Sequence, residues 1–218
     1  MIKKFYEETG MYIDWKQLSK LPDIDTLIDI GVSINGTPKL YERFEGKKLI
    51  LVDPLDEAKE YAKNKLKHRN VTFYQTALGK VDDQNFEIKV QKKEGFTSLL
   101  EISDFNMEDN YSEKRKIKIN RLDTILNNKK DLGKIGIKID VEGYELDVLK
   151  GSLETLKYTK FVIAEVRHNH ESLKEVYKLH EFMNLMNKNN FVLTMILTAK
   201  PFIADLCFQP NNELSFEN

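Results

Sequence analysis

The feature that most constrains the fold of this 218-residue chain is a regular alternation of short apolar runs with helical stretches. The apolar runs, which we expect to be strands, are 26–30, 48–53, 71–76, 135–140, 160–166 and 191–197. The helical stretches are 38–44, 56–67, 142–150 and 173–187. Apolar strands that alternate with helices are typical of a parallel sheet covered on both faces, so the pattern predicts one α/β domain.

Two segments depart from this pattern and predict a small β insertion. Residues 86–90 and 116–120 alternate apolar and polar side chains, as half-exposed strands do. They flank a polar stretch at 92–115. We therefore expect an insertion at about 85–120, near the mouth of the fold.

The two ends of the chain give separate predictions. Residues 202–209 read as a last strand, and the short link from 191–197 favours an antiparallel pair because parallel strands need a longer crossover. Residues 1–24 read as a helical lead-in to a main domain at 25–218. Four of its side chains can pack in the core or against a second subunit, which leaves a homo-oligomer open: Phe5, Tyr12, Trp15 and Leu18.

Composition and charge argue against several classes of protein. The net charge is −1, so no global basic field favours nucleic acid. The single cysteine, Cys207, excludes a disulfide within the chain, and its apolar neighbours predict a buried strand residue. No apolar run is long enough to span a membrane and the first residues lack the apolar core of a signal peptide, so we expect a cytoplasmic protein.

The first candidate site follows the strand predicted at 26–30, where the sequence reads LIDIGVSINGT. A strand that ends in Asp-x-Gly, here Asp29 and Gly31, brings backbone N–H groups near a ligand, and glycine permits a positive φ. Ser33 and Asn35 stand where a glycine-rich dinucleotide loop has glycines, which argues against a nicotinamide enzyme. These two residues either contact a cofactor or only form the turn.

The second candidate is Asp53, at the end of the next predicted strand. An acidic side chain there can accept hydrogen bonds from both ribose hydroxyls, which serves NAD and S-adenosylmethionine alike. Asp53 alternatively caps the following helix. The third strand ends in TALG, where small residues leave room for a flat base beside Ala77 and Leu78, or form a plain turn at Gly79.

The most specific segment is IGIKIDVEGYELDVLKGS, at 135–152. A lysine inside an apolar strand needs a partner, and side chains two apart on a strand share a face, so we expect Lys138 and Asp140 to pair. Asp140 ends the strand on the side where ligands bind in open α/β sheets, and a helix is expected from Glu142. The pair belongs either to an active site or to a structural ion pair.

The run KIDVEGYELDVLKG resembles the signature of FkbM-type methyltransferases, and the resemblance extends over about 25–208. Shorter motifs also carry it: DIG at 29–31, VDP at 52–54, ALG at 77–79, TSL at 97–99, RLD at 121–123 and AEV at 164–166. The resemblance implies a single Rossmann-like class I methyltransferase domain, whose seven-stranded sheet is mostly parallel with an antiparallel last strand. It also implies O-methylation, often of sugars or natural products.

S-adenosylmethionine is the cofactor that this resemblance implies. We expect one set of residues to bind it: Asp29, Gly31, Ser33, Asn35, Asp53, Pro54, Ala77, Leu78 and Asp140. The expected acceptor is a hydroxyl of a sugar, a glycan precursor or a related small molecule. Two rival functions remain, a nicotinamide-dependent oxidoreductase on a similar fold and a binding protein that keeps the fold without catalysis.

The segment AEVRHNH, at 164–170, adds the last candidates for catalysis. Glu165 ends a strand expected beside that of Asp140, and His168 and His170 follow it. Carboxylates and a histidine can bind a divalent cation, so Asp140, Glu165 and His168 are candidate ligands of Mg²⁺ or Mn²⁺. In the alternative without metal, Asp140 or His168 is the base and Lys138 lowers the pKa of the acceptor hydroxyl. His170 reads as a surface residue.

Overall fold

The computed structural model describes residues 15–91, 97–100, 111–127, 129–167, 176–199 and 202–211. The strands are β1 (Thr26–Ile30), β2 (Lys48–Val52), β3 (Val71–Tyr74), β4 (Ala77–Leu78), β5 (Gln84–Gln91), β6 (Tyr111–Asn120), β7 (Ile135–Ile139), β8 (Thr159–Arg167), β9 (Phe191–Ala199) and β10 (Ile203–Pro210). The helices are α2 (Pro38–Arg43), α3 (Asp56–Lys65), α4 (Leu122–Ile125), α5 (Glu145–Lys150), α6 (Leu153–Leu156) and α7 (Leu179–Lys188). Two 3₁₀ turns, η1 (Trp15–Lys20) and η3 (Lys129–Leu132), complete the described elements.

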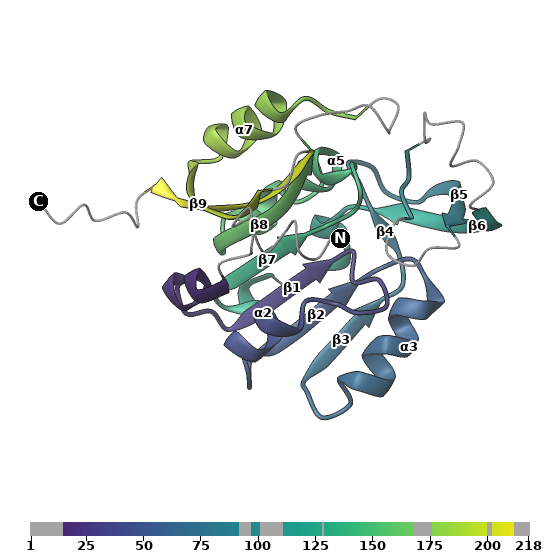
Figure 1. The fold of residues 1–218 in the computed structure, drawn as a ribbon, viewed down its shortest axis with the longest axis horizontal. Coiled ribbons are helices and arrows are strands. Elements are labelled where there is room, and N and C mark those ends of the chain that lie inside the picture. The colour runs from purple at the N-terminus through teal and green to yellow at the C-terminus, as the bar shows by residue number, and fades with distance from the viewer. Residues whose placement is uncertain are drawn as a thin grey trace, which may run out of the picture.

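Seven strands form one sheet in the order β3-β2-β1-β7-β8-β10-β9 (Figure 1). Strands β3, β2, β1, β7 and β8 pair in parallel. The last strand, β10, pairs antiparallel with both β8 and β9. This confirms the predicted mostly parallel sheet with an antiparallel C-terminal strand.

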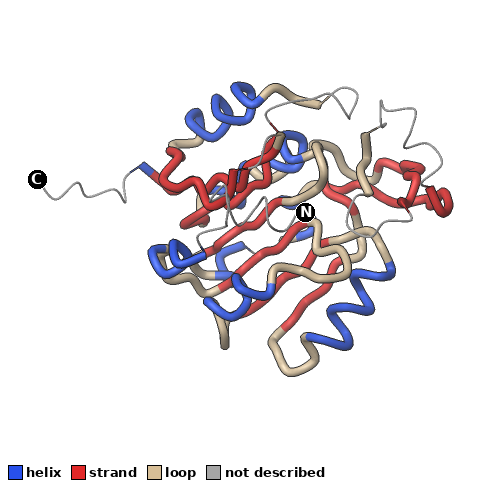
Figure 2. Tube along the Cα trace, in the orientation of Figure 1, coloured by secondary structure: helices blue, strands red, loops and turns tan. Residues whose placement is uncertain are grey.

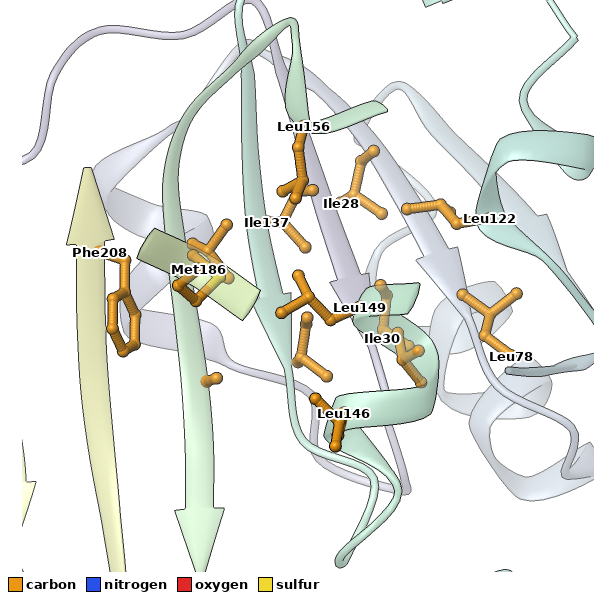
Figure 3. Packing of buried hydrophobic residues seen from close by; sticks show 14 of the residues in the cluster. Ile28, Ile30, Leu78, Leu122, Ile137, Leu146, Leu149, Leu156, Met186 and Phe208 are labelled. Carbon is orange, nitrogen blue, oxygen red and sulfur yellow. The ribbon is translucent and has the colours of Figure 1, made fainter. Parts of the chain in front are cut away.

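Helices cover both faces of this sheet (Figure 2). On one face, α4, α5, α6 and α7 bury side chains against β1, β7, β8 and β10, as Figure 3 shows for Leu146 and Leu149 of α5 beside Ile30 and Ile137. On the other face, η1, α2 and α3 pack against residues of β1, β2, β8, β9 and β10, such as Leu27. The two buried faces explain why the strands read as continuous apolar runs.

A second sheet of three strands, in the order β4-β6-β5, lies beside the C-terminal end of β3 (Figure 1). β5 and β6 form an antiparallel pair, and β4 joins β6 in parallel. Their apolar face contains Ala77, Ile88, Val90, Ile117 and Ile119. The small β insertion predicted from alternating residues is therefore present as a sheet, with strands that begin earlier than the sequence suggested.

Two predicted helices begin later than expected. The helix expected from Glu142 begins at Glu145, because Glu142 and Gly143 adopt left-handed φ values of 54° and 103° and form a turn instead. The helix expected from residue 173 begins at Leu179, where the Lys178 N–H donates to the Glu181 carboxylate at 2.7 Å. Apolar spacing alone did not reveal these local starts.

Two smaller expectations are also answered. Cys207 is fully buried in β10, as its apolar neighbours predicted. Across the described ranges, every helix is too short or too polar to cross a bilayer. Residues 1–14 of the lead-in lie outside the described residues, so the packing expected for Phe5 and Tyr12 stays a prediction.

Candidate functional site

The C-terminal ends of β1, β2 and β7 open onto a cavity of about 250 Å³. Eight of the nine predicted cofactor residues line it: Gly31, Ser33, Asn35, Asp53, Pro54, Ala77, Leu78 and Asp140. The predicted catalytic residue Glu165 lines it as well. A parallel sheet gathers its strand ends at one edge, which is why residues distant in sequence meet here.

The loop after β1 forms one wall of the cavity. Gly31 has a φ of +84°, and a Cβ there would lie 1.7 Å from the carbonyl oxygen of Asp140. Ser33 also adopts a left-handed φ of 53°, and its N–H donates to Asp53 Oδ2 at 2.9 Å. The loop therefore requires glycine at position 31 for its backbone conformation and for its close contact with Asp140, which follows the neighbouring strand β7.

Asp53 is nearly buried at the end of β2, and both of its carboxylate oxygens accept backbone hydrogen bonds. Oδ2 accepts from Ser33, and Oδ1 accepts from the Leu55 N–H at 2.8 Å. Burial raises the pKa of Asp53 to about 6 and outweighs these hydrogen bonds, which favour the charged form. Asp53 thus ties the β1 loop to the start of α3 and presents its carboxyl group to the cavity.

Asp29 is the one predicted cofactor residue outside the cavity lining. It lies in β1 beneath the loop, almost fully buried, and accepts a hydrogen bond from the Tyr41 hydroxyl of α2. Burial raises its pKa, and the nearby Lys138 ammonium opposes that rise. The structure therefore places Asp29 against α2, outside the cavity lining.

Apolar side chains form another wall of the cavity. Leu55 directly precedes α3 and Ala77 and Leu78 form β4, while Ile88 and Leu99 come from the insertion. Asn120 donates to Thr76 Oγ1 at 2.9 Å and thereby fixes the end of β6 beside this wall. The arrangement suits a flat, largely apolar group that is inserted between Asp53 and the β5–β6 sheet.

Lys138 and Asp140 form the ion pair that the sequence predicted. Lys138 Nζ lies 2.9 Å from Asp140 Oδ2, and the lysine side chain is only 6% exposed. Burial alone would lower the pKa of Lys138, but the carboxylates of Asp140, Asp205 and Asp29 outweigh it and hold the pKa above its usual range. One buried ammonium therefore balances carboxylates from three different strands.

The turn after β7 adds a carboxylate that the sequence placed in a helix. Glu142 forms an ion pair with Arg167 at the end of β8. Its main-chain carbonyl accepts a hydrogen bond from the Ser98 hydroxyl at 2.6 Å. Burial and the neighbouring Asp140 raise the pKa of Glu142 to about 7. The motifs around Ser98 and Arg167 were visible in the sequence, but their contacts with Glu142 were not.

Glu165 completes a group of three carboxylates around the far end of the cavity. Ligand oxygens of Asp140, Glu142 and Glu165 all lie within 4.8 Å of one another. Across the sheet, Glu165 of β8 is directly opposite Asp205 of β10. Burial, together with the charges of Asp140, Glu142 and Asp205, raises the pKa of Glu165 to about 8. This end of the cavity therefore holds two carboxyl groups, those of Glu142 and Glu165, whose pKa values are raised toward or above neutral pH.

The histidine candidates are not placed by the structure. His168 and His170 lie outside the described residues, so a role of His168 as base or metal ligand stays a prediction. Within the described chain, Glu142 supplies the third carboxylate next to Asp140 and Glu165.

Three comparisons with known proteins bear on this site. A profile of the FkbM methyltransferase domain matches residues 29–193, which include both sides of the cavity. No curated protein matches the chain. Among solved structures, a putative S-adenosylmethionine-dependent methyltransferase from Listeria monocytogenes matches with a TM-score of 0.51 and 10% identity, over 90% of this chain and 97% of that one. That likeness supports the fold.

Two further solved structures match less well. A SAM-dependent methyltransferase from Aquifex aeolicus has a TM-score of 0.47 and 16% identity, over 95% of each chain. A magnesium protoporphyrin IX methyltransferase from Synechocystis PCC 6803 has a TM-score of 0.49 and 9% identity, over 95% of this chain and 81% of that one. The assignment rests on the domain profile, which spans most of the chain and contains the cavity. The chain belongs to the FkbM methyltransferase domain family and is an S-adenosylmethionine-dependent methyltransferase.

Proposed function

We propose that this enzyme methylates a hydroxyl group of a sugar, a glycan precursor or a related small molecule. The observation that carries the proposal is the polarity of the cavity along its length. One end has Asp53 and an apolar wall, whereas the other end has Asp140, Glu142 and Glu165. A nucleoside suits the first end, and a positively charged sulfonium next to a hydroxyl suits the second.

The cofactor site follows from the donors and acceptors on the cavity wall. Asp53 accepts hydrogen bonds from the ribose hydroxyls while its backbone partners hold the carboxyl group in place. The adenine base lies against the apolar side chains of Leu55, Ala77 and Leu78. Asp140 lies near the cationic end of the cofactor, and Asp29 supports the loop from beneath.

S-adenosylmethionine supplies an electrophilic methyl group, so the protein must orient an acceptor oxygen and accept its proton. Glu165 is the candidate base, because it lines the cavity and its pKa of about 8 matches a working pH near neutrality. Asp140 is ion-paired with Lys138 beside Glu165, so the two carboxyl groups have different surroundings. His168 stays the alternative base.

The charge of the acceptor end supports a neutral acceptor. Carboxylates accept hydrogen bonds from sugar hydroxyls, as Glu142 and Glu165 can do from the cavity wall. A phosphate or carboxylate beside the reacting hydroxyl would add to the negative charges that already raise the pKa of Glu165, and would disfavour the ionised form that a base needs. We therefore propose a neutral polyhydroxylated acceptor near the methyl group.

A divalent cation on Asp140, Glu142 and Glu165 is the alternative that their convergence supports. Oxygen ligands of this kind favour Mg²⁺ or Mn²⁺. Two of the three carboxylates already have a cationic partner, Lys138 for Asp140 and Arg167 for Glu142. Since a metal would have to compete with both, we favour proton removal by Glu165 without metal.

The test is release of S-adenosylhomocysteine from S-adenosylmethionine with a panel of neutral sugars and their phosphorylated counterparts. We expect turnover with a neutral acceptor, and a loss of about 10²–10⁴-fold in kcat for Glu165→Gln, the range for general base catalysis. Glu154→Gln, at an exposed carboxylate on α6, is the control and should keep full activity. Turnover only with phosphorylated sugars would contradict the acceptor class. A melting temperature that rises with NADH but not with S-adenosylhomocysteine would contradict the cofactor.

A further inference from the structure

The segment 97–100 contacts two parts of the site that are far apart in the sequence. Leu99 packs against the apolar face of the second sheet and lines the cavity on the side assigned to adenine. The neighbouring Ser98 lines the same cavity and reaches the turn after β7. Consecutive side chains therefore connect the cofactor wall with the acceptor end.

The contact of Ser98 is well defined. Its hydroxyl donates to the main-chain carbonyl of Glu142 at 2.6 Å and accepts the Leu100 N–H at 3.0 Å. The second bond fixes the rotamer of the hydroxyl, so the first has a defined direction. Ser98 thus anchors the segment to the turn by a hydrogen bond between positions 44 residues apart.

The turn that receives this hydrogen bond has an unfavourable backbone conformation. Glu142 has a left-handed φ of 54°, which a residue with a side chain rarely adopts. From below, Glu145 Oε1 accepts the N–H groups of Val141 and Gly143 at 3.2 and 2.9 Å. From the side, Arg167 holds the Glu142 carboxylate. Ser98 supplies the contact from the cavity side.

We propose that Ser98 is a positioning residue that couples occupancy of the cofactor site to the conformation of the Asp140–Glu142 turn. A base bound against Leu99 stabilises the segment 97–100, and Ser98 then holds Glu142 in the conformation that directs its carboxylate toward Asp140 and Glu165. The inference rests on the proposed cofactor position beside Leu99. It predicts that a bound cofactor stabilises the conformation of the turn that the structure shows.

The experiment uses the full chain and S-adenosylhomocysteine as the probe. Hydrogen–deuterium exchange follows the amides of residues 140–147 with and without saturating probe, and calorimetry gives its Kd. In the wild type we expect the probe to slow exchange of the turn by about fivefold, the change in an opening equilibrium that one hydrogen bond supplies. In Ser98→Ala we expect the Kd to change less than about twofold while this slowing disappears.

Two matched variants keep the result interpretable. Ser98→Thr keeps a hydroxyl and should restore the slowing. Ser152→Ala removes another serine hydroxyl that donates to a backbone carbonyl, that of Val148 at 2.7 Å, at the opposite end of α5. Ser152→Ala should retain the wild-type response to the probe. A wild-type melting temperature for Ser98→Ala shows that its fold is intact.

The possible failures are distinct. If Ser98→Ala binds the probe and its turn is protected as in the wild type, the coupling is wrong. The same conclusion follows if the wild type binds the probe without any change at 140–147. If the wild type does not bind the probe at all, the proposed cofactor site fails, and the inference fails with it.

Discussion

Gly31 and Asp140 are in direct backbone contact, because a Cβ at position 31 would lie only 1.7 Å from the Asp140 carbonyl oxygen. The two residues end neighbouring strands, β1 and β7, and the Asp140 N–H donates to the Ile30 carbonyl at 2.9 Å. The loop after β1 and the start of the turn after β7 are therefore one packed unit. A displacement at either residue has to move the other.

We expect Gly31→Ala to abolish binding of S-adenosylhomocysteine. It should also lower the free energy of unfolding by more than the cost of placing alanine at a left-handed φ. Gly46→Ala is the matched control, since Gly46 also has a left-handed φ, +78°, but a Cβ added there would meet no heavy atom within 4 Å. A left-handed alanine costs about 1–2 kcal/mol, which is the expected loss at position 46. Calorimetry and denaturant unfolding measure both effects. Equal losses of stability in the two variants would contradict a steric clash between a Cβ at position 31 and the Asp140 carbonyl.

Asp53→Ala should weaken S-adenosylhomocysteine binding by at least about tenfold, because charge-assisted hydrogen bonds to the ribose are lost. Since the pKa of Asp53 is raised to about 6, the wild-type affinity should also fall as the pH drops through 6 and the carboxylate becomes protonated. The variant should lack this pH dependence. The control is Asp56→Ala, at the exposed first residue of α3, which should keep the wild-type affinity. Calorimetry at pH 5.5 and 7.5 distinguishes these outcomes.

Glu165→Gln should stabilise the protein at alkaline pH. The pKa of Glu165 is raised from 4.5 to about 8, so the folded state binds the proton more tightly than the unfolded state. Stability from this group is therefore present at low pH and is lost as the pH rises from about 4.5 to 8. The loss is on the order of 1–3 kcal/mol by pH 8. Glutamine cannot ionise and avoids that loss.

The measurement for this prediction is the melting temperature of the wild type and Glu165→Gln at pH 5 and pH 8. The variant should gain several degrees relative to the wild type at pH 8 and little at pH 5. Glu60→Gln, an exposed carboxylate on α3, should show no such difference. A Glu165→Gln variant that is equally destabilised at both pH values would show that the carboxylate contributes mainly through packing or hydrogen bonds.

Lys138→Met should destabilise the protein by about 3–5 kcal/mol, because it leaves buried carboxylates without their shared cation. Asp29 is the most deeply buried of them, so the double variant Lys138→Met/Asp29→Asn should recover part of this loss. If Lys138 also acts at the active site, both the single and the double variant should lack turnover. Urea unfolding and an activity assay separate the two effects. A single variant as stable as the wild type would contradict the shared charge balance.

Chelation tests the role of a divalent cation. We expect full turnover in EDTA, because Lys138 and Arg167 already neutralise two of the three converging carboxylates. Loss of turnover in EDTA, with recovery on addition of Mg²⁺ or Mn²⁺ but not Ca²⁺, would instead assign the metal to Asp140, Glu142 and Glu165. A Glu142→Gln variant should then lower the apparent affinity for the metal.

The strands of the main sheet could be predicted from the sequence because each strand has a local cause. Continuous apolar runs predicted buried parallel strands, and the short link before β10 predicted the antiparallel pair. Small and acidic residues at predicted strand ends also indicated three positions that line the cavity, Gly31, Asp53 and Asp140. Strand ends of a parallel sheet lie at one edge whatever the detailed packing.

The tertiary structure alone decided which charges share a partner. Sequence spacing predicted Lys138 with Asp140, but the sheet register brought Asp29 opposite Lys138 and Asp205 opposite Glu165. Glu142 lies in a turn in place of the predicted helix and forms an ion pair with Arg167 at the end of β8, a tertiary contact that helix propensity could not predict. Local sequence determines where a strand ends, whereas the position of its neighbours determines what each terminal side chain meets.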